Sequence, residues 1–294
     1  DRYNVFAEAT VSEHTGLLRF TYPENEEKKM IINLSRRIGG KADYQEVDIL
    51  NDRKIEGHIK CTPKGGGFGH GDGKIFYDLY FVMEFSQPFI NKRFFSNEEF
   101  VENCKDEDLG VFLDFSNENK EPLTVKCAIS YVDIEKKKKN FAEECENVDF
   151  DTMAENALQK WEDVFSCIKV SGTDEIDLKL FYTCLYHVLL DPRTMADVDG
   201  RFVINYEVFK DSDYKQRTVF SGWDVYRSEF PLLSIIRPDM VRDDINSLLK
   251  IAEINNSSFP RWELLGINAG CMVGDPGLIV LADAFVKGIK PYNI

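Results

Sequence analysis

The sequence predicts a multidomain protein in which a β-sheet domain is followed by a helical domain, and three observations support this fold class. Up to about residue 131, apolar residues occur in short runs separated by charged or glycine-containing turns. From residue 150 onward they recur at the spacing of an α-helix. The 294 residues are enough for two cores, since a domain takes ~150 residues. Strand-like runs without helical pattern between them are typical of an antiparallel β-sandwich.

The predicted strands of the first domain are short runs rich in aromatic and β-branched residues. In the longest run, residues 75–85, Phe81 and other apolar residues are mixed with Asp78 and Glu84, which indicates one buried and one exposed face. The predicted strands cover residues 17–22, 30–34, 57–61, 75–85, 110–115 and 123–131.

The boundary between the domains is expected at residues 145–151, where the period changes. The preceding lysine run, residues 136–139, is followed by three glutamates, and we interpret it as a solvated loop. The β-sandwich domain then covers residues 1–148.

A linker helix is predicted within residues 149–172. Met153 and Trp161 lie on one face of the pattern at 150–168, and Thr152 with Glu155 forms a possible capping box at its start. The helix therefore leads from the sandwich into the second domain.

The remaining chain, residues 173–294, is predicted to hold the opening helices of a larger helical domain. One helix covers 174–190, with an apolar row that includes Ile176 and Leu180, and ends before Asp191-Pro192. Another begins at Pro238, and a last one runs from 276 to 287 with Gly288 as its C-terminal cap. A single strand is predicted among these helices, at residues 201–209.

Charge and composition exclude several classes of function. The chain has 36 basic and 51 acidic residues, a net charge of −15, whereas nucleic-acid binding needs clustered Lys and Arg. We expect no membrane span, because no run approaches ~20 uninterrupted apolar residues. The seven cysteines form no CxxC pair, so no zinc signature is visible.

A glycine-rich loop, KGGGFGHGDGK at residues 64–74, is the most conspicuous segment of the first domain. It matches no phosphate-binding pattern and is followed by a strand, so a flexible hairpin connection is the favoured interpretation. The alternative is a loop that reaches into a pocket at the domain interface, with His70 as a polar contact.

Two segments of the second domain combine aromatic and charged residues. FSGWDVYRSEFPLL occupies residues 220–233, and FPRWELLGINAGCMVGDP occupies residues 259–276. A Trp beside an Asp can bind a sugar, since the ring covers C–H groups and the carboxylate accepts hydroxyls. A Trp on a helix is, however, more often part of the core.

These segments together resemble glycoside hydrolase family 92, the calcium-dependent exo-acting α-mannosidases. The resemblance rests on FSGWDVYR at 220–227, WELLG at 262–266, CMVGDP at 271–276 and ADAFVKGI at 282–289. It implies an N-terminal β-sandwich followed by an (α/α)6 toroid, with the active site between them. It also implies hydrolysis of terminal α-linked mannose with inversion.

The resemblance also implies roles for individual residues. Trp223 and Asp224 would contact the mannose to be cleaved, and Arg227 would orient Asp224 or form only a surface ion pair. Asn268 stands where the family has the glutamate that acts as general acid, within its G-N-E-T pattern. Glu263 could replace that acid only through a different loop path.

Asn268 changes the expected substrate. An amide cannot protonate a departing sugar oxygen, which should cost ~10²–10⁴-fold in rate on an ordinary mannoside. Family members with a neutral amide at this position act on mannose-1-phosphate diesters, whose phosphate leaves as a stabilised anion. The expected partner is therefore a mannosyl phosphodiester or another mannose-containing glycan.

Calcium is the cofactor that the resemblance implies. The catalytic base and most calcium ligands are expected beyond Ile294, so no metal ligand is assigned within the chain, and a secreted or periplasmic location is expected. A non-catalytic carbohydrate-binding protein, or an inactive fragment, is the alternative left open by Asn268. A scaffold protein without mannose binding is a third interpretation.

Overall fold

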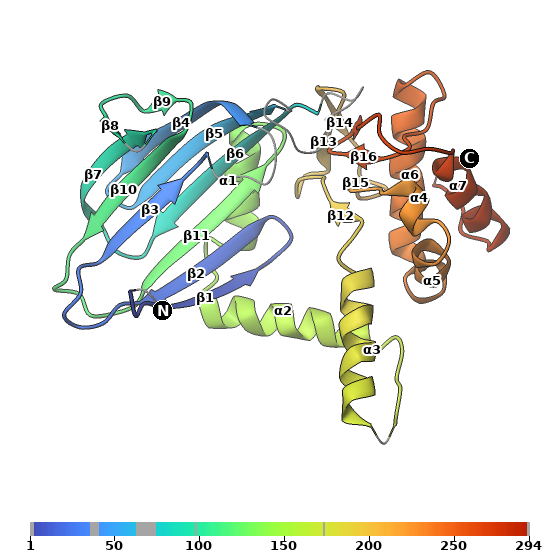
Figure 1. The fold of residues 1–294 in the computed structure, drawn as a ribbon, viewed down its shortest axis with the longest axis horizontal. Coiled ribbons are helices and arrows are strands. Elements are labelled where there is room, and N and C mark those ends of the chain that lie inside the picture. Colours follow the sequence, from blue (N-terminus) through green and yellow to red (C-terminus); the bar gives the residue numbers. More distant parts are fainter. Residues whose placement is uncertain (1–2, 36–40, 63–74, 98, 173, 293–294) are drawn as a thin grey trace. The chain divides into compact units, whose positions relative to one another are not determined.

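The computed structural model describes residues 3–35, 41–62, 75–97, 99–172 and 174–292. These residues form two compact units that divide at Leu158 and Gln159. The first unit carries the two larger sheets, and the second carries most of the helices together with short paired strands (Figure 1).

The first unit contains two antiparallel sheets. In the larger sheet the strands lie in the order β1 (Phe6–Val11), β2 (Thr15–Thr21), β11 (Leu123–Ser130), β6 (Tyr77–Phe85), β5 (Lys54–Thr62), β4 (Lys41–Asn51) and β9 (Lys105–Asp106). In the smaller sheet the order is β3 (Lys29–Asn33), β10 (Leu109–Phe115), β7 (Phe89–Ser96) and β8 (Glu99–Val101). The register places β10 between β3 and β7, and β11 between β2 and β6.

Alternation along the strands builds the core between the sheets. Val47, Ile55 and Phe81 of the larger sheet and Val111 and Leu113 of the smaller sheet are buried in one cluster. Neighbouring residues point to the opposite faces, as the strand period requires. The structure thus confirms the predicted β-sandwich followed by helices.

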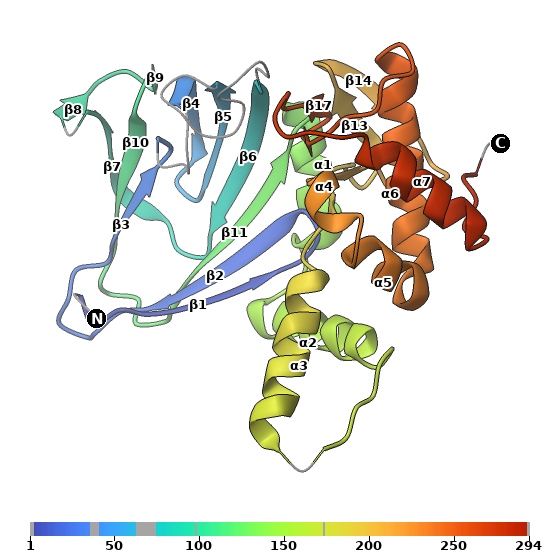
Figure 2. The same cartoon turned by 45° about the vertical axis from the view of Figure 1, so that its right-hand side comes forward.

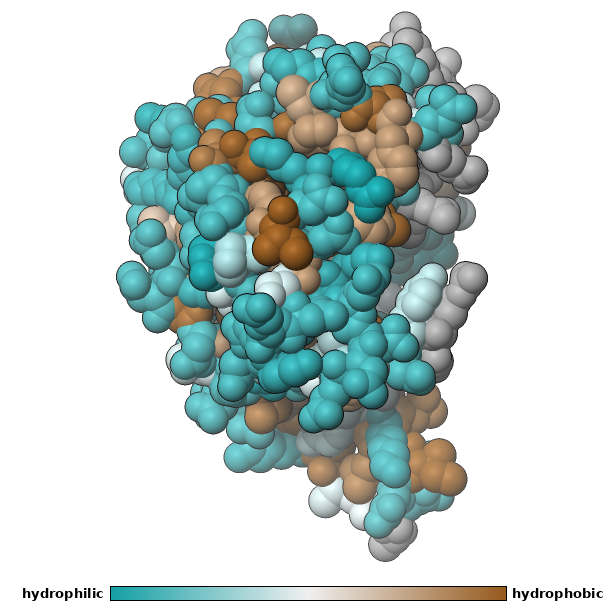
Figure 3. Space-filling model, turned by 90° about the vertical axis from the view of Figure 1, so that its left-hand side faces the viewer, coloured by the Kyte–Doolittle hydropathy of each residue, from teal (hydrophilic) through white to brown (hydrophobic). Residues whose placement is uncertain are grey.

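The outer side of the smaller sheet is mainly hydrophilic, with scattered apolar patches (Figure 3). Ile31 on β3, Ile90 on β7 and Phe100 on β8 are exposed. Arg93 covers the Phe100 ring at 4.6 Å from its centroid, which shields part of this apolar surface.

Every predicted strand of the first domain coincides with an observed one, and the structure adds β1, β4, β7, β8 and β9. The longer of these additional strands, β4 and β7, were not predicted because they contain several charged residues. Strand β4 carries Asp48 on its exposed positions, and β7 carries Lys92 and Arg93, so their apolar content is low. A strand with one solvent-exposed face needs only every second residue to be apolar.

Helix α1 (Ile134–Glu144) shows that the interpretation of the lysine run as a solvated loop is wrong. Asp133 caps the helix, and one lysine of the run, Lys137, is fully buried. Its Nζ donates to the Phe81 carbonyl (2.8 Å) and forms an ion pair with Glu56 (3.0 Å), without hydrogen-bond geometry to that carboxylate. Composition alone could not show that one of four lysines faces the sheet.

The second unit is mainly helical, and its described residues also form two small hairpins and one pair of short strands that are not consecutive in the sequence (Figure 2). Helix α2 (Phe150–Phe165) leads into it. The further helices are α3 (Glu175–Val188), α4 (Gly222–Val225), α5 (Glu229–Ile236), α6 (Pro238–Ile254) and α7 (Pro276–Val286). The paired short strands are β12 (Arg193–Thr194) with β15 (Arg217–Thr218), β13 (Arg201–Ile204) with β14 (Glu207–Lys210), and β16 (Glu263–Leu264) with β17 (Ile267–Asn268).

The core of the second unit lies among α5, α6 and α7. Phe230, Leu233, Ile245 and Val280 are buried together with Phe220. In contrast, the apolar row predicted on α3 is exposed, with Ile176 75% and Leu180 60% accessible. Among the described helices, none has both the length and the apolar content that crossing a membrane requires.

Two helix ends agree with their predicted signals. Pro238 opens α6, and Gly288 follows α7 with a φ of +85°, a left-handed conformation that favours glycine. The capping box at Thr152 is wrong, because the carboxylate of Asp149 accepts the Thr152 N–H (2.8 Å) and the helix already begins at Phe150.

The single strand predicted at 201–209 is also wrong. It is the hairpin of β13 and β14, with Asn205 and Tyr206 in the turn at φ of 48° and 71°. Asn is one of the residues that accept this left-handed conformation, and a two-residue turn of this kind matches the strand twist. The apolar alternation continues through the turn, which made two strands look like one.

The buried ion pair leads to a prediction for stability. Lys137→Ala leaves the buried Glu56 carboxylate with only its longer ion pair to the exposed Lys138 (3.8 Å), so we expect a loss of about 3 kcal/mol in the free energy of unfolding. Urea denaturation followed by circular dichroism measures it. Lys139→Ala on the same helix removes a largely exposed lysine and should change little. Equal effects of the two substitutions would contradict the assignment.

Candidate functional site

The candidate site lies in the second unit, where the segments 220–233 and 259–276 meet. The strands β16 and β17 form a tight hairpin, and Leu265 and Gly266 occupy its turn at positive φ. Phe220 pairs with Glu263 through two backbone hydrogen bonds of 3.1 and 2.9 Å. The two sequence segments singled out for their chemistry are therefore neighbours in space.

The side chain of Glu263 holds this junction together. It is 1% exposed, and its Oε1 accepts hydrogen bonds from the Thr218 hydroxyl (2.9 Å) and the Gly266 N–H (2.6 Å). Its Oε2 accepts from the Phe220 N–H (3.3 Å), and the Thr218 hydroxyl oxygen accepts from the Leu265 N–H (2.7 Å). A buried carboxylate thus ties the strand before α4 to the hairpin turn.

A second buried carboxyl group, Asp244 on α6, lies within electrostatic reach of Glu263. Burial raises the pKa of Asp244 to about 8, and the charge of Glu263 adds to this effect. Burial also raises the pKa of Glu263 to about 7, although its hydrogen-bond donors favour the charged form. Arg217 is held by Asp243 at 3.0 Å, so it is engaged with a different carboxylate. Asp244 is the group that retains a proton near neutral pH.

Trp223 and Asp224 lie on the short helix α4, next to this junction. The Ser221 hydroxyl donates to Asp224 Oδ2 (2.6 Å) and accepts from the indole N–H of Trp262 (2.6 Å). Asp224 is exposed, and 40% of Trp223 is accessible, so both can meet a ligand. Trp223 and Asp224 therefore lie on the surface of the unit, with the Asp224 carboxylate fixed by Ser221, and they are not part of the core.

Gly222 is required where α4 packs against the second segment. A Cβ at this position would lie 2.2 Å from Cγ of Pro276 and 2.5 Å from the carbonyl oxygen of Arg261. No side chain fits into that space. The glycine before Trp223 therefore lets the two segments approach each other.

Asn268 lies directly across the hairpin from Glu263. It is half-buried, and its Oδ1 accepts the Gly270 N–H (3.2 Å), which leaves its amide hydrogens as donors. Glu263 cannot act as general acid in its place, because it is buried and both of its oxygens are occupied. The different loop path that such a role would need is absent from the described hairpin.

The structure does not join the other two candidates to this group. The Arg227 Nε donates to the Tyr226 hydroxyl (2.8 Å), and within the described residues Arg227 has no ion pair with Asp224. Ser221, not Arg227, holds the Asp224 carboxylate. His70 lies outside the described residues.

Sequence reasoning missed the residues that support the site. Ser221 lies within the motif FSGWDVYR but was given no role, Thr218 lies outside the motifs, and Glu263 was considered only as a substitute acid. One signal was present, since Glu263 is the only acidic residue in the apolar stretch WELLG at 262–266. A charged residue inside an apolar run is either exposed or paired, and here it is paired.

The described residues do not supply a calcium site here. Calcium prefers six to eight oxygen ligands, whereas Asp224 is held by Ser221 and Glu263 by Thr218 and backbone N–H groups. In the described ranges, the one group of three acidic, histidine or cysteine side chains within reach of a single ion lies in the first unit.

Comparison with known protein families gives two matches that together cover nearly the whole chain. Residues 1–130 match the glycosyl hydrolase family 92 N-terminal domain, and residues 136–294 match the glycosyl hydrolase family 92 catalytic domain. No curated protein matches the chain.

Solved structures show the same similarity. The family GH92 α-mannosidase BT3965 from Bacteroides thetaiotaomicron is 26% identical with a TM-score of 0.90, over 99% of this chain and 40% of that one. Its complex with mannoimidazole gives 26% and 0.88, over 99% and 39%. The inverting mannosidase BT2199 from B. thetaiotaomicron VPI-5482 is 23% identical with a TM-score of 0.83, over 98% and 38%. This chain therefore spans about 40% of the length of these proteins.

The buried carboxyl pair predicts how stability depends on pH. The folded state keeps protons on Asp244 and Glu263 up to pH 7–8, whereas the unfolded chain releases them near pH 4. The folded state binds more protons in this window, so the free energy of unfolding should fall as pH rises from about 4 to 8.

Asp244→Asn tests this origin of the pH dependence. The amide cannot ionise, so the decrease between pH 5 and pH 8.5 in denaturant titrations should become shallower. Asp239→Asn replaces an exposed carboxylate on the same helix and should keep the wild-type slope. Identical slopes for all three proteins would show that Asp244 titrates normally.

Proposed function

The chain belongs to glycoside hydrolase family 92, and from this premise we propose that it acts on terminal α-linked mannose carried by a phosphodiester. Trp223 and Asp224 would bind the sugar, and Asn268 would face the leaving group. The observation that carries the proposal is Asn268, an amide where the family resemblance expects the general acid, paired across the hairpin with a glutamate whose oxygens are engaged elsewhere.

The exposed pair on α4 supports binding of a sugar ring. The Trp223 ring offers an apolar face for C–H groups, and the Asp224 carboxylate can accept hydrogen bonds from hydroxyls. Ser221 restricts the carboxylate to one position, so less conformational freedom is lost when a ligand binds. The complex of a related α-mannosidase with mannoimidazole is consistent with this class of ligand.

The amide of Asn268 suits an anionic leaving group. Its Oδ1 is occupied by the Gly270 N–H, so its Nδ2 hydrogens can donate to a phosphoryl oxygen. A glutamate in this place would repel the phosphate when ionised. The amide thus assists a group that leaves without being protonated.

The proposed reaction is hydrolysis of the bond between C1 of mannose and the phosphate oxygen. Water attacks C1 from the opposite side, the C1–O bond breaks, and its electron pair stays on the phosphate. A base takes the proton of the water, and the products are mannose and a phosphate monoester. The configuration at C1 inverts.

We extend the proposal to a calcium requirement, which is supported by the family resemblance and not by the described side chains. Removing calcium with a chelator should abolish turnover by the natural protein, and adding calcium should restore it. Turnover that is unaffected by the chelator would refute this part of the proposal.

The alternative is a carbohydrate-binding protein without catalysis. Asn268 also favours this alternative, because a protein that has lost catalytic activity can carry an amide in place of the catalytic acid. It predicts binding of mannose without turnover of either a mannoside or a mannosyl phosphodiester.

Substrate preference tests the phosphodiester proposal. We expect the natural protein to hydrolyse an α-mannose-1-phosphate diester faster than an unactivated neutral mannoside by ~10²-fold or more, since only the mannoside needs an acid. Asn268→Glu should slow the diester reaction and accelerate the mannoside reaction, whereas Asn268→Ala should slow the first without accelerating the second. Faster cleavage of the neutral mannoside by the natural protein would overturn the proposal.

The sugar-binding role of α4 has its own test. Trp223→Ala should weaken binding of mannose or raise KM at least ~10-fold, because the apolar platform is lost. Ser221→Ala should have a smaller effect, because Asp224 remains but is no longer held. Phe285→Ala, which truncates an exposed aromatic residue on α7, serves as the control. Unchanged binding in Trp223→Ala would rule out this platform.

A further inference from the structure

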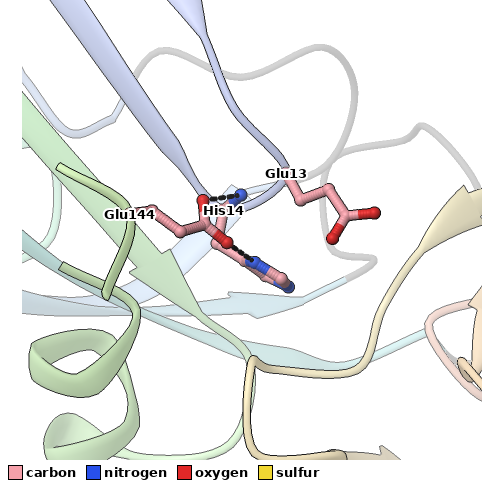
Figure 4. Close-up of side chains that lie close together, drawn as sticks. All are labelled: Glu13, His14 and Glu144. Atoms are coloured by element: carbon pink, nitrogen blue, oxygen red, sulfur yellow. Dashed lines mark hydrogen bonds and ion pairs between the residues drawn. The ribbon is translucent and has the colours of Figure 1, made fainter. Parts of the chain in front are cut away.

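The turn between β1 and β2 meets the C-terminal end of α1 in a polar cluster (Figure 4). Glu13 and His14 come from the turn, and Glu144 is the last residue of the helix. The ligand atoms of these three side chains all lie within 4.8 Å of one another. Residues 130 positions apart in the sequence therefore share one small volume.

The positions of His14 and Glu144 are fixed by surrounding contacts. Their side chains are 8% and 15% exposed, and His14 Nδ1 lies 2.5 Å from Glu144 Oε1. The other carboxylate oxygen, Oε2, accepts hydrogen bonds from the backbone N–H of His14 (3.0 Å) and from the Ser12 hydroxyl. Glu144 Oε1 and His14 Nδ1 therefore point toward each other, while hydrogen bonds to Oε2 fix the orientation of the carboxylate.

Charge also favours a cation at this place. Glu143, Glu144 and Glu146 lie at or just beyond the C-terminal end of α1, where the helix dipole is negative, and the last turn contains no basic residue. Lys126 reaches the carbonyl oxygens of Cys145 and Glu146 and not the carboxylate of Glu144. Glu13 adds a further negative charge from the turn.

We propose that Glu13, His14 and Glu144 bind a divalent transition-metal ion, with Zn²⁺ as the best match. One imidazole nitrogen and two carboxylate oxygens, completed by water, form a tetrahedral set that suits Zn²⁺, whereas calcium prefers oxygen ligands only. His14 can bind the ion through Nδ1 in the tautomer that carries the ring hydrogen on Nε2, and the metal then lies between Nδ1 and the Glu144 carboxylate.

The geometry needs only a small adjustment to accept the ion. Two ligands of a tetrahedral ion with bonds of ~2.1 Å lie ~3.4 Å apart. His14 Nδ1 and Glu144 Oε1 would therefore separate from 2.5 Å to about that distance. Ser12 and the His14 N–H keep their bonds to Oε2, and they orient the carboxylate as outer-shell partners do in metal sites.

The proposed ion would join the β1–β2 turn to α1, which is a structural role and goes beyond the proposed hydrolase function. The thermal stability of the chain should rise with the logarithm of the free metal concentration once that concentration exceeds Kd, because only the folded state brings the three ligands together. This readout does not depend on any enzymatic activity.

Calorimetric titration of the metal-free complete chain with Zn²⁺ tests the proposal. We expect one ion per chain and a higher Tm. Glu13→Gln replaces an exposed carboxylate ligand by an amide of the same shape, so it should weaken binding at least ~10-fold while the variant stays folded in chelator. His14→Ala should abolish it.

Matched controls separate this site from other zinc-binding groups. His58→Ala removes a histidine of the same unit that pairs with Asp78 at 2.6 Å and has no third ligand among the described residues, and this variant should bind Zn²⁺ like the natural chain. Co²⁺ substitution excludes the free cysteines, because thiolate ligands would add intense charge-transfer bands. Wild-type affinity in Glu13→Gln, thiolate bands, equal affinity for Ca²⁺, or the absence of stoichiometric binding would each overturn the proposal.

Discussion

The candidate site depends on one buried carboxylate. Glu263 accepts hydrogen bonds from Thr218, Phe220 and Gly266, and the Thr218 hydroxyl adds a second link to the hairpin turn through the Leu265 N–H. Burying an ionisable group is costly unless its hydrogen bonds are satisfied, and here they are. The positions of Trp223 and Asp224 on one side and Asn268 on the other follow from this anchor.

In each unit, buried and hydrogen-bonded charged side chains join segments that are distant in the sequence. In the first unit, Lys137 joins α1 to β5 and β6, and the cluster of Glu13, His14 and Glu144 joins the β1–β2 turn to the end of α1. Apolar packing is non-directional and tolerates small shifts, whereas a buried hydrogen-bonded charge permits few alternatives. These polar junctions therefore define the relative positions of segments that apolar packing alone would leave adjustable.

The chemistry of the site is divided between residues that contact a ligand and residues that hold them. Asp224 is kept in place by Ser221, which is in turn bonded to Trp262, so the second segment supports the first. Asn268 is oriented by the Gly270 N–H and can donate through its amide hydrogens. The proposal of an uncharged sugar next to an anionic leaving group rests on this arrangement.

The sequence by itself determined the order of a β-sandwich and a helical part, the ends of α6 and α7 at Pro238 and Gly288, and the motifs that carry Trp223, Asp224 and Asn268. These features depend on local signals: apolar periodicity, proline and glycine geometry, and short contiguous motifs. Only the tertiary structure decided that Lys137 is buried, that Ser221 rather than Arg227 holds Asp224, and that Glu263 is an anchor. The fate of a polar side chain depends on partners that lie far away in the sequence, and no local pattern specifies them.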